Sequence, residues 1–275
     1  MKPLRALIRS VGWKGKGLHT GEESSVEVRP SRRPGIYFIN GDGEVPLSSL
    51  EADGTGRGTT VIFEDGRRVM TVEHLLGSLS GLGIWHAVIR VEGKEIPALD
   101  GSGRFFTEDL DKVAVDAKDE GPLPFIITNS VMVENQSNGA FVAAFPALKS
   151  RFTSVTRYDD MDPSTQSAEY SHDPSVFPGA VAPARTFVLE KEIEGILSRG
   201  LARGGSLENA LVFGRQGPVG PQRFPDEAPR HKILDLLGDL ALLGRPVLGH
   251  IFSYKGGHAL NIRLVERLRR ISAIN

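Results

Sequence analysis

The sequence predicts a mixed α+β protein built from two similar units. Each half of the 275-residue chain begins with short strand-like segments and continues into an apolar segment of helical period. Residues 116–124, DAKDEGPLP, are charged and then rich in Gly and Pro, which is typical of a linker. We therefore expect an N-terminal domain at residues 1–119 and a C-terminal domain at residues 120–275. No internal repeat is strong enough to prove a duplication.

The composition is that of a globular protein and excludes several other classes. Hydrophobic residues make up 40% of the chain and charged residues 24%, as in packed domains rather than disordered chains. Lys and Arg number 33 against 34 Asp and Glu, so the basic excess of a nucleic-acid-binding protein is missing. The chain has no cysteine, which excludes disulfides, thiolate metal sites and a Cys nucleophile.

Neither a signal peptide nor a membrane span is expected. The first 21 residues contain no long apolar stretch and no small-residue cleavage site. No apolar run reaches the roughly 18 residues that a membrane span needs. The most apolar stretch, residues 233–248, still contains Asp235, Asp239 and Arg245. We expect a soluble cytoplasmic protein. The absence of cysteine fits the reducing conditions of that compartment.

The first half is predicted to contain short strands and two helices. Short segments rich in apolar and β-branched residues indicate strands at residues 25–29, 35–40, 59–63 and 87–91, with Pro or Gly in the turns between them. Apolar residues recur at helical spacing at Val72, Leu75, Leu76 and Leu79. Thr71 is the expected N-cap of this helix, and the glycines at positions 81 and 83 end it. A short helix is expected at residues 105–113.

The second half is predicted to start again with strands. Strands are expected at residues 125–133, 140–145, 209–213 and 250–254, and helices at residues 190–198, 229–243 and 261–270. Residues 159–179 are polar and rich in proline, and they give no clear prediction.

The helix at residues 229–243 carries a polar edge. Pro229 suits its first position, and Gly244 suits its end. His231, Asp235 and Asp239 are spaced four apart and therefore lie along one edge, opposite an apolar face. A His and a carboxylate one turn apart can bind a metal ion. The alternative is an ordinary polar helix edge.

Two further histidines have sequence neighbours that are compatible with metal binding or proton transfer. His74 begins the other long helix beside Glu73, and such a pair can bind an ion while the carboxylate takes a proton from water. The alternative is a buried core histidine. His258 follows two glycines, which allow a close approach of its imidazole, although a plain loop explains them equally well. With Asp235 and His231, His74 completes a set of three ligands with an open fourth position, as in catalytic zinc sites.

Seven motifs, in order along the chain, closely resemble those of the UDP-3-O-acyl-N-acetylglucosamine deacetylases, zinc enzymes of lipid A synthesis. The motifs are GLHTG at residues 17–21, TVEHL at 71–75, IPALDGS at 96–102, ARTF at 184–187, GGS at 204–206, RHKILD at 230–235 and GHALN at 257–261. The resemblance spans nearly the whole chain.

This resemblance implies a fold and a reaction. The fold has two similar βααβ domains with helices sandwiched between two sheets and the active site at the domain interface. The reaction is hydrolysis of the N-acetyl group of UDP-3-O-acyl-N-acetylglucosamine, with release of acetate. The cofactor is one Zn²⁺, or alternatively ferrous iron, held by His74, His231 and Asp235. Nothing indicates an oligomer, so a monomer is assumed.

The resemblance also implies the roles of individual residues. Glu73 is the general base, and His258 is the general acid, oriented by Asp239. Thr186 stabilises the oxyanion, and Lys232 lies near the reacting sugar.

Substrate contacts follow from the same resemblance. His19 and Lys255 match positions that contact the diphosphate. An insert at residues 187–212 builds a passage for the acyl chain. Its expected lining residues are Phe187, Ile193, Ala202, Gly205, Ser206, Leu207 and Ala210.

Departures from the family pattern are few. Trp85 and His86 replace a small or polar pair, and Gly15-Lys16 precedes Gly17 in place of the commoner Gly-Val. Residues 158–177 align poorly, so the uridine contacts cannot be transferred. Two alternatives remain. One is a non-catalytic sugar-nucleotide-binding module, which would not need an acid and a base. The other is a deacetylase of another acylated amino sugar, against which the apolar lining of the insert discriminates, since only an acylated substrate needs it.

Overall fold

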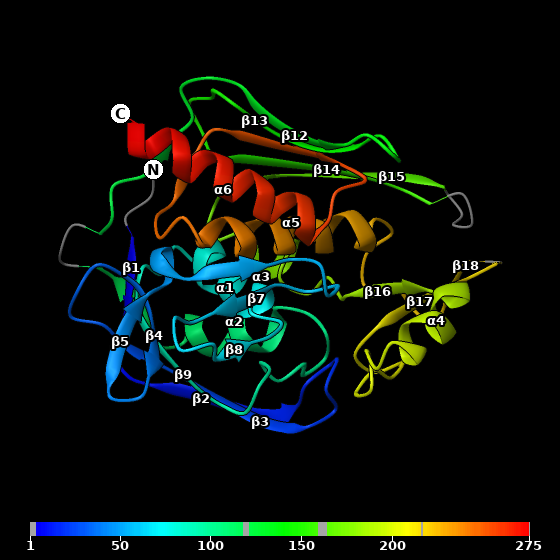
Figure 1. The fold of residues 1–275 in the computed structure, drawn as a ribbon, viewed down its shortest axis with the longest axis horizontal. Coiled ribbons are helices and arrows are strands. Elements are labelled where there is room, and N and C mark those ends of the chain that lie inside the picture. The colour runs from blue at the N-terminus through cyan, green and yellow to red at the C-terminus, as the bar shows by residue number, and fades with distance from the viewer. Residues whose placement is uncertain (1–3, 118–120, 159–163, 216, 275) are drawn as a thin grey trace.

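The protein is a layered α/β structure (Figure 1). The computed structural model describes residues 4–117, 121–158, 164–215 and 217–274. Within these residues it contains six α-helices and several sheets. Two five-stranded sheets form the lower and upper layers in Figure 1, and α1 (Glu73–Gly81) and α5 (Glu227–Ala241) lie between them.

The two large sheets have the same pattern of strand pairing. The first has the order β2-β3-β9-β4-β5 and the second the order β12-β13-β20-β14-β15. In each, the third strand is antiparallel to the second and parallel to the fourth, and the outer pairs are antiparallel. The strands of the first sheet are β2 (Val11–Lys16), β3 (Glu23–Pro30), β4 (Gly35–Asn40), β5 (Gly43–Pro46) and β9 (His86–Glu92). Those of the second are β12 (Val131–Asn135), β13 (Ala140–Phe145), β14 (Arg151–Arg157), β15 (Thr165–Ser171) and β20 (His250–Tyr254).

Four small sheets complete the strand structure. Their pairs are β1 (Arg5–Leu7) with β10 (Ala114–Asp116) and β11 (Phe125–Ile126) with β19 (Val247–Leu248). Two of the small sheets have three strands each. One consists of β6 (Glu51–Asp53), β7 (Thr60–Ile62) and β8 (Arg68–Val69), and the other of β16 (Phe187–Leu189), β17 (Leu211–Gly214) and β18 (Gly217–Val219).

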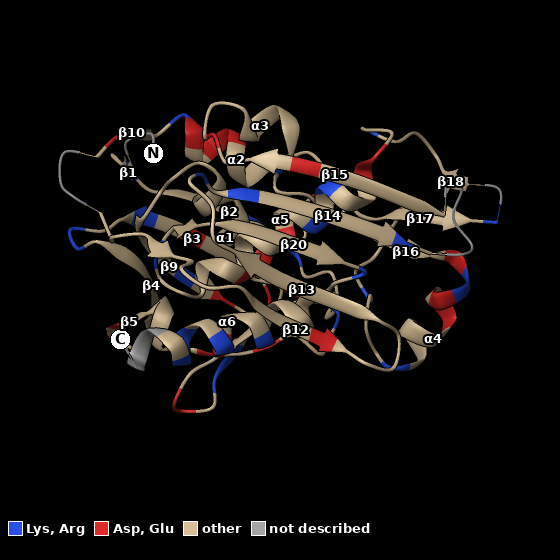
Figure 2. Cartoon of the chain, turned by 90° about the horizontal axis from the view of Figure 1, so that it is seen from above, with Lys and Arg blue, Asp and Glu red and all other residues tan. Residues whose placement is uncertain are grey.

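Four further helices are present in the described part of the chain. They are α2 (Arg104–Asp111), α3 (Phe177–Ala180), α4 (Ile193–Ser198) and α6 (His258–Ile274), with 3₁₀ turns at Leu47–Ser49 and Glu190–Glu192. Figure 2 shows the second sheet from above, with α6 running beside β12. No helix in the described part of the chain is long and apolar enough to cross a bilayer.

Two glycines allow α1 and α5 to pack with their backbones in close contact. A Cβ atom on Gly238 of α5 would lie 2.0 Å from the carbonyl oxygen of Glu73. A Cβ atom on Gly77 of α1 would lie 2.7 Å from the carbonyl oxygen of Leu234. Any larger residue would separate the helices. Every residue of α1 is buried, as expected for a helix enclosed on all sides. The crossing therefore brings polar residues of α1 and α5 together inside the molecule.

Most of the predicted elements are confirmed. The predicted strands at residues 25–29, 35–40, 59–63, 87–91, 140–145, 209–213 and 250–254 correspond to β3, β4, β7, β9, β13, β17 and β20. The predicted helices correspond to α1, α2, α4, α5 and α6, and Gly244 follows α5 with a φ of 73°. The expected domain boundary, between residues 119 and 120, lies outside the described residues.

Three local predictions are wrong. Thr71 is not the N-cap, because Val72 holds that position; Thr71 has a φ of 58°, and its hydroxyl donates to Glu95. Pro229 is the third residue of α5, because the helix begins at Glu227. The single strand expected at residues 125–133 is two strands, β11 and β12, in different sheets. Residues 164–179, which gave no prediction, contain β15 and α3.

Candidate metal centre and active site

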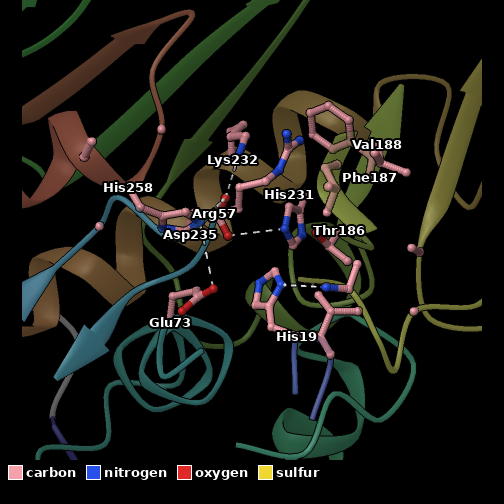
Figure 3. A pocket seen from close by; sticks show the side chains of 18 of the residues that line it. His19, Arg57, Glu73, Thr186, Phe187, Val188, His231, Lys232, Asp235 and His258 are labelled. Atoms are coloured by element: carbon pink, nitrogen blue, oxygen red, sulfur yellow. Dashed lines mark hydrogen bonds and ion pairs between the residues drawn. The ribbon is translucent and has the colours of Figure 1, made fainter. Parts of the chain in front are cut away.

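Three buried side chains converge where α1 crosses α5. Figure 3 labels two of them, His231 and Asp235. His74 comes from α1, and His231 and Asp235 come from successive turns of α5. One donor atom from each lies within 4.8 Å of the others. The Nε2 atoms of His231 and His74 lie 3.3 Å and 3.8 Å from Asp235 Oδ1. Two imidazoles and a carboxylate at this spacing are a suitable donor set for a divalent metal ion.

The hydrogen bonds of these side chains also fit a metal ion. His231 Nδ1 lies 3.0 Å from the carbonyl oxygen of Ala184, which can only accept, so Nδ1 carries the proton. Nε2 therefore presents its lone pair to the other ligands, as in metal sites with an oriented histidine. Asp235 Oδ1 is buried and makes no hydrogen bond to the described residues. A buried carboxylate oxygen without a donor calls for a cation.

Burial and neighbouring charges keep the three side chains in the protonation states that a metal requires. Burial, with a contribution from His231, lowers the pKa of His74 to about 3. Burial also lowers the pKa of His231. For Asp235, burial would raise the pKa, but His231 and Lys232 outweigh it and hold the pKa well below its usual range. Lys232 Nζ donates to Asp235 Oδ2 over 3.0 Å. The set is thus two neutral imidazoles and one carboxylate.

Glu73 lies at the first position of α1, beside these ligands. Its Oε2 atom accepts a hydrogen bond from the backbone N–H of Thr59 over 2.9 Å. Its Oε1 atom lies 3.8 Å from His258 Nε2. Burial raises the pKa of Glu73 to about 7, against the opposing effect of His258. A carboxylate with this pKa can take up a proton near neutral pH.

His258 faces Glu73 from the first residue of α6. Its Nδ1 atom donates to Asp239 Oδ2 over 2.9 Å, so Nε2 is the atom that faces Glu73 and Asp235. Burial alone would lower the pKa of His258, but Asp239, Asp235 and Glu73 outweigh it and raise the pKa to about 9. The imidazole is therefore protonated at neutral pH and able to donate a proton.

A cavity of about 680 Å³ opens in front of these groups. Of the site residues predicted from the sequence, only Asp239 is absent from its lining, because it lies behind His258. The polar end holds the ligand set, Glu73, His258, Thr186, Lys232 and His19. The predicted passage residues that line the cavity are Phe187, Ile193, Ala202, Gly205, Ser206, Leu207 and Ala210.

The two residues expected at the diphosphate lie in different surroundings. His19 is buried, and its Nε2 has no hydrogen-bond partner among the described residues. A Cβ atom on Gly58 would lie 3.5 Å from His19 Nε2 and 3.0 Å from Glu73 Oε1, so His19 and Glu73 both face Gly58. Lys255 instead donates to the carbonyl oxygen of Asn138 over 3.1 Å. Within the described ranges, no hydrogen bond joins His19 to Lys255.

Residues 5–270 match the sequence model of the family LpxC, described as UDP-3-O-acyl N-acetylglycosamine deacetylase. The chain belongs to this family.

Relatives of similar length carry the same description. A protein of Synechocystis sp. is 38% identical over 93% of this chain and 94% of its own length. A protein of Thermosynechococcus vestitus is 37% identical over 96% of this chain and 93% of its own. A protein of Chlamydia caviae is 36% identical over 97% of both. Each is named UDP-3-O-acyl-N-acetylglucosamine deacetylase.

Two residues in or beside the cavity were not found from the sequence. Arg57 lines the cavity with a φ of 64° and pairs with Glu192 of the insert over 3.1 Å. The glycine-rich run DGTGRG at residues 53–58 is typical of a loop and could have indicated one near the site. Glu95 is buried and accepts hydrogen bonds from Thr71, Thr20 and the amide of His19. No sequence signal marks Glu95, since its partners are distant in the chain.

Proposed function

We propose that this chain is a zinc-dependent deacetylase that hydrolyses the N-acetyl group of UDP-3-O-acyl-N-acetylglucosamine and releases acetate, a step of lipid A biosynthesis. The observation that carries the proposal is one cavity with two different ends. One end holds three metal-type donors between Glu73 and His258, and the other is lined by apolar residues of the insert. The names of the relatives supply the substrate class.

His74, His231 and Asp235 would hold the ion. A zinc ion bound by these donors supplies a Lewis acid that polarises a carbonyl and makes water more acidic. Imidazole and carboxylate donors also suit ferrous iron, so the choice between the two metals depends on availability as well as on ligand type.

Glu73 would act as the general base. Its Oε2 is fixed by the amide of Thr59, which leaves Oε1 on the side of His258 and the cavity. With a pKa of about 7, this oxygen can remove a proton from the attacking water at neutral pH. The hydroxyl of Thr186, which lines the same end of the cavity, would donate to the oxyanion that develops on the acetamide.

His258 would act as the general acid. An amine leaves an amide only when its nitrogen receives a proton, and His258 Nε2 would supply this proton. Asp239 holds the other ring nitrogen and favours the charged imidazolium. The products would be acetate and an amino sugar that keeps its UDP and acyl groups.

The remaining groups would bind the substrate. The side chains of residues 187–212 would enclose the 3-O-acyl chain, since they form the apolar end of the cavity. Lys232 would lie near the reacting sugar, and Lys255 and His19 would contact the diphosphate. Every group in this account comes from one chain, so we propose that a monomer is sufficient.

The fold favours a two-domain arrangement for this site. We propose that residues 1–119 and 120–275 form two similar βααβ domains with their helices sandwiched between the sheets. The identical strand pairing of the two large sheets supports this division. The interface would then carry the active site, because α1 supplies His74 and Glu73 and α5 supplies His231 and Asp235.

The test compares acetate release from UDP-3-O-acyl-N-acetylglucosamine with release from UDP-N-acetylglucosamine, which lacks the acyl chain. We expect acetate from the first substrate and far slower release from the second. No acetate from the acylated substrate would refute the proposed function. Equal turnover of both would refute the acyl passage and favour a deacetylase of other amino sugars.

A further inference from the structure

Thr59, one residue before β7, contacts both groups that the mechanism uses for proton transfer. Its side chain is fully buried and does not line the cavity. Its backbone N–H donates to Glu73 Oε2 over 2.9 Å. Its hydroxyl donates to Asp239 Oδ1 over 2.5 Å and lies 3.2 Å from His258 Nδ1. One residue therefore connects the base to the Asp-His pair that forms the acid.

The hydrogen bonds of Asp239 explain why the Thr59 hydroxyl matters. Asp239 Oδ2 accepts from His258 Nδ1 over 2.9 Å and from Asn261 Nδ2 over 2.8 Å. Oδ1 accepts from Thr59, the one donor to this oxygen among the described residues. Both carboxylate oxygens are thus held, and rotation of Asp239 away from His258 would break the bond to Thr59. A buried carboxylate oxygen that loses its donor is costly, so the group would reorient.

We propose that Thr59 is a positioning residue that aligns the general acid with the general base. Its amide directs Glu73 Oε1 toward His258, and its hydroxyl fixes Asp239 so that His258 Nε2 faces the cavity. The proposal rests on the proposed function for the roles of Glu73 and His258. The hydroxyl acts through Asp239 and, among the described residues, makes no hydrogen bond with the three metal donors, so it should affect the rate and not the metal.

A purely structural role for the hydroxyl predicts a different result. If it only satisfied a buried carboxylate, its loss would lower the stability of the protein and leave the turnover of the folded fraction unchanged. A positioning role predicts a lower kcat in a folded, metal-loaded protein with a nearly unchanged KM, because Thr59 does not touch the substrate cavity.

The test uses Thr59→Val and Thr59→Ser in the zinc-loaded enzyme. Valine has the shape of threonine and keeps the backbone N–H but removes the hydroxyl, whereas serine keeps it. We expect kcat to fall about 10- to 100-fold in Thr59→Val, the effect of losing a hydrogen bond to a charged group, and to recover in Thr59→Ser. Thr60→Val is the matched control, since the neighbouring Thr60 is also a buried residue and its hydroxyl makes no hydrogen bond to the described residues. Its kcat should equal that of the wild type. Thr59→Ala provides the same deletion if valine prevents folding.

A second measurement does not depend on turnover. In protein labelled with ¹⁵N-histidine, with and without zinc, the proton on His258 Nδ1 should give the same NMR signal in wild type and Thr59→Ser and a shifted or lost signal in Thr59→Val. Wild-type kcat in Thr59→Val, equal impairment of Thr59→Ser, or an unchanged His258 signal would overturn the proposal. If the wild type releases no acetate, the proposed function fails, while the NMR comparison still decides whether Thr59 positions His258.

Discussion

The pKa values of two similarly buried histidines of this site shift in opposite directions. His74 and His258 are both buried, yet the pKa of His74 falls to about 3 and that of His258 rises to about 9. The difference lies in their neighbours. His74 packs against another imidazole, with the ring centres 4.9 Å apart, whereas His258 lies among Asp239, Asp235 and Glu73. Charge placement therefore makes one histidine a suitable metal ligand and the other a suitable acid.

We predict a bell-shaped dependence of kcat/KM on pH. Activity should rise as Glu73 loses its proton near pH 7 and fall as His258 loses its proton near pH 9. Glu73→Ala should lose the acidic limb and His258→Ala the alkaline limb, each with a rate loss of about 10²–10⁴-fold. Metal content should stay at the wild-type level in both variants. If His258→Ala retains both limbs and near-normal activity, His258 is not the acid.

The sequence predicted the spacing of some of these residues but not their connections. The separation of His231, Asp235 and Asp239 by four positions was enough to place them on one helix edge. The contacts of Thr59 with Asp239 and His258 join residues that are 180 and 199 positions apart. Such contacts depend on how the elements pack, and no local pattern records them.

At the level of elements, the close crossing of α1 and α5 depends on glycine. We predict that Gly238→Ala lowers the free energy of unfolding by about 1–3 kcal/mol, because the added Cβ would lie 2.0 Å from Glu73 O and must push the helices apart. It should also reduce metal content by displacing α1 from α5. Gly195→Ala in α4 is the control: its Cβ would meet nothing within 4 Å, so it should be neutral or slightly stabilising. Denaturant unfolding measures the free energy of unfolding, and elemental analysis measures the metal content. If both quantities were the same in Gly238→Ala and Gly195→Ala, the close helix crossing would not depend on Gly238.

The insert elements should set the preference for acyl chain length. Ala210 lines the apolar end of the cavity, so Ala210→Phe should fill part of it and favour shorter acyl substrates. Each CH₂ group removed from burial is worth about 0.8 kcal/mol, so KM should respond steeply to chain length in the wild type. A series of substrates with different acyl chains measures this effect. An unchanged preference in Ala210→Phe would place the acyl chain elsewhere.

The elements that the sequence missed have weak patterns. In β15 the buried positions are Gln166, Ala168 and Tyr170, and in β14 they are Phe152, Ser154 and Thr156. These residues alternate correctly, but polar or small side chains occupy half or more of the inward positions in each strand. Alternation of hydrophobicity therefore gave no signal, although the strands are held firmly by pairing with each other and with β20.

At the scale of the whole molecule, the fold class was predictable and the strand order of the two large sheets was not. Strand order and direction follow from pairing between distant segments, which a single sequence does not contain. The metal donors come from helices in both halves, so binding of an ion should stabilise the whole structure. We predict that zinc raises the unfolding midpoint of the wild type, by the equivalent of about 2.7 kcal/mol at 100 times its dissociation constant. His231→Ala should lose this effect. If zinc stabilised that variant as much as it stabilises the wild type, the metal site would not include His231.

The central claim is that the donors His74, His231 and Asp235 hold an ion on which deacetylation depends. It is tested most directly by acetate release from UDP-3-O-acyl-N-acetylglucosamine before chelation, after chelation and after return of zinc. We expect a chelator to abolish acetate release and about one equivalent of zinc per chain to restore it. Metal-free protein that continues to release acetate at the original rate would contradict it.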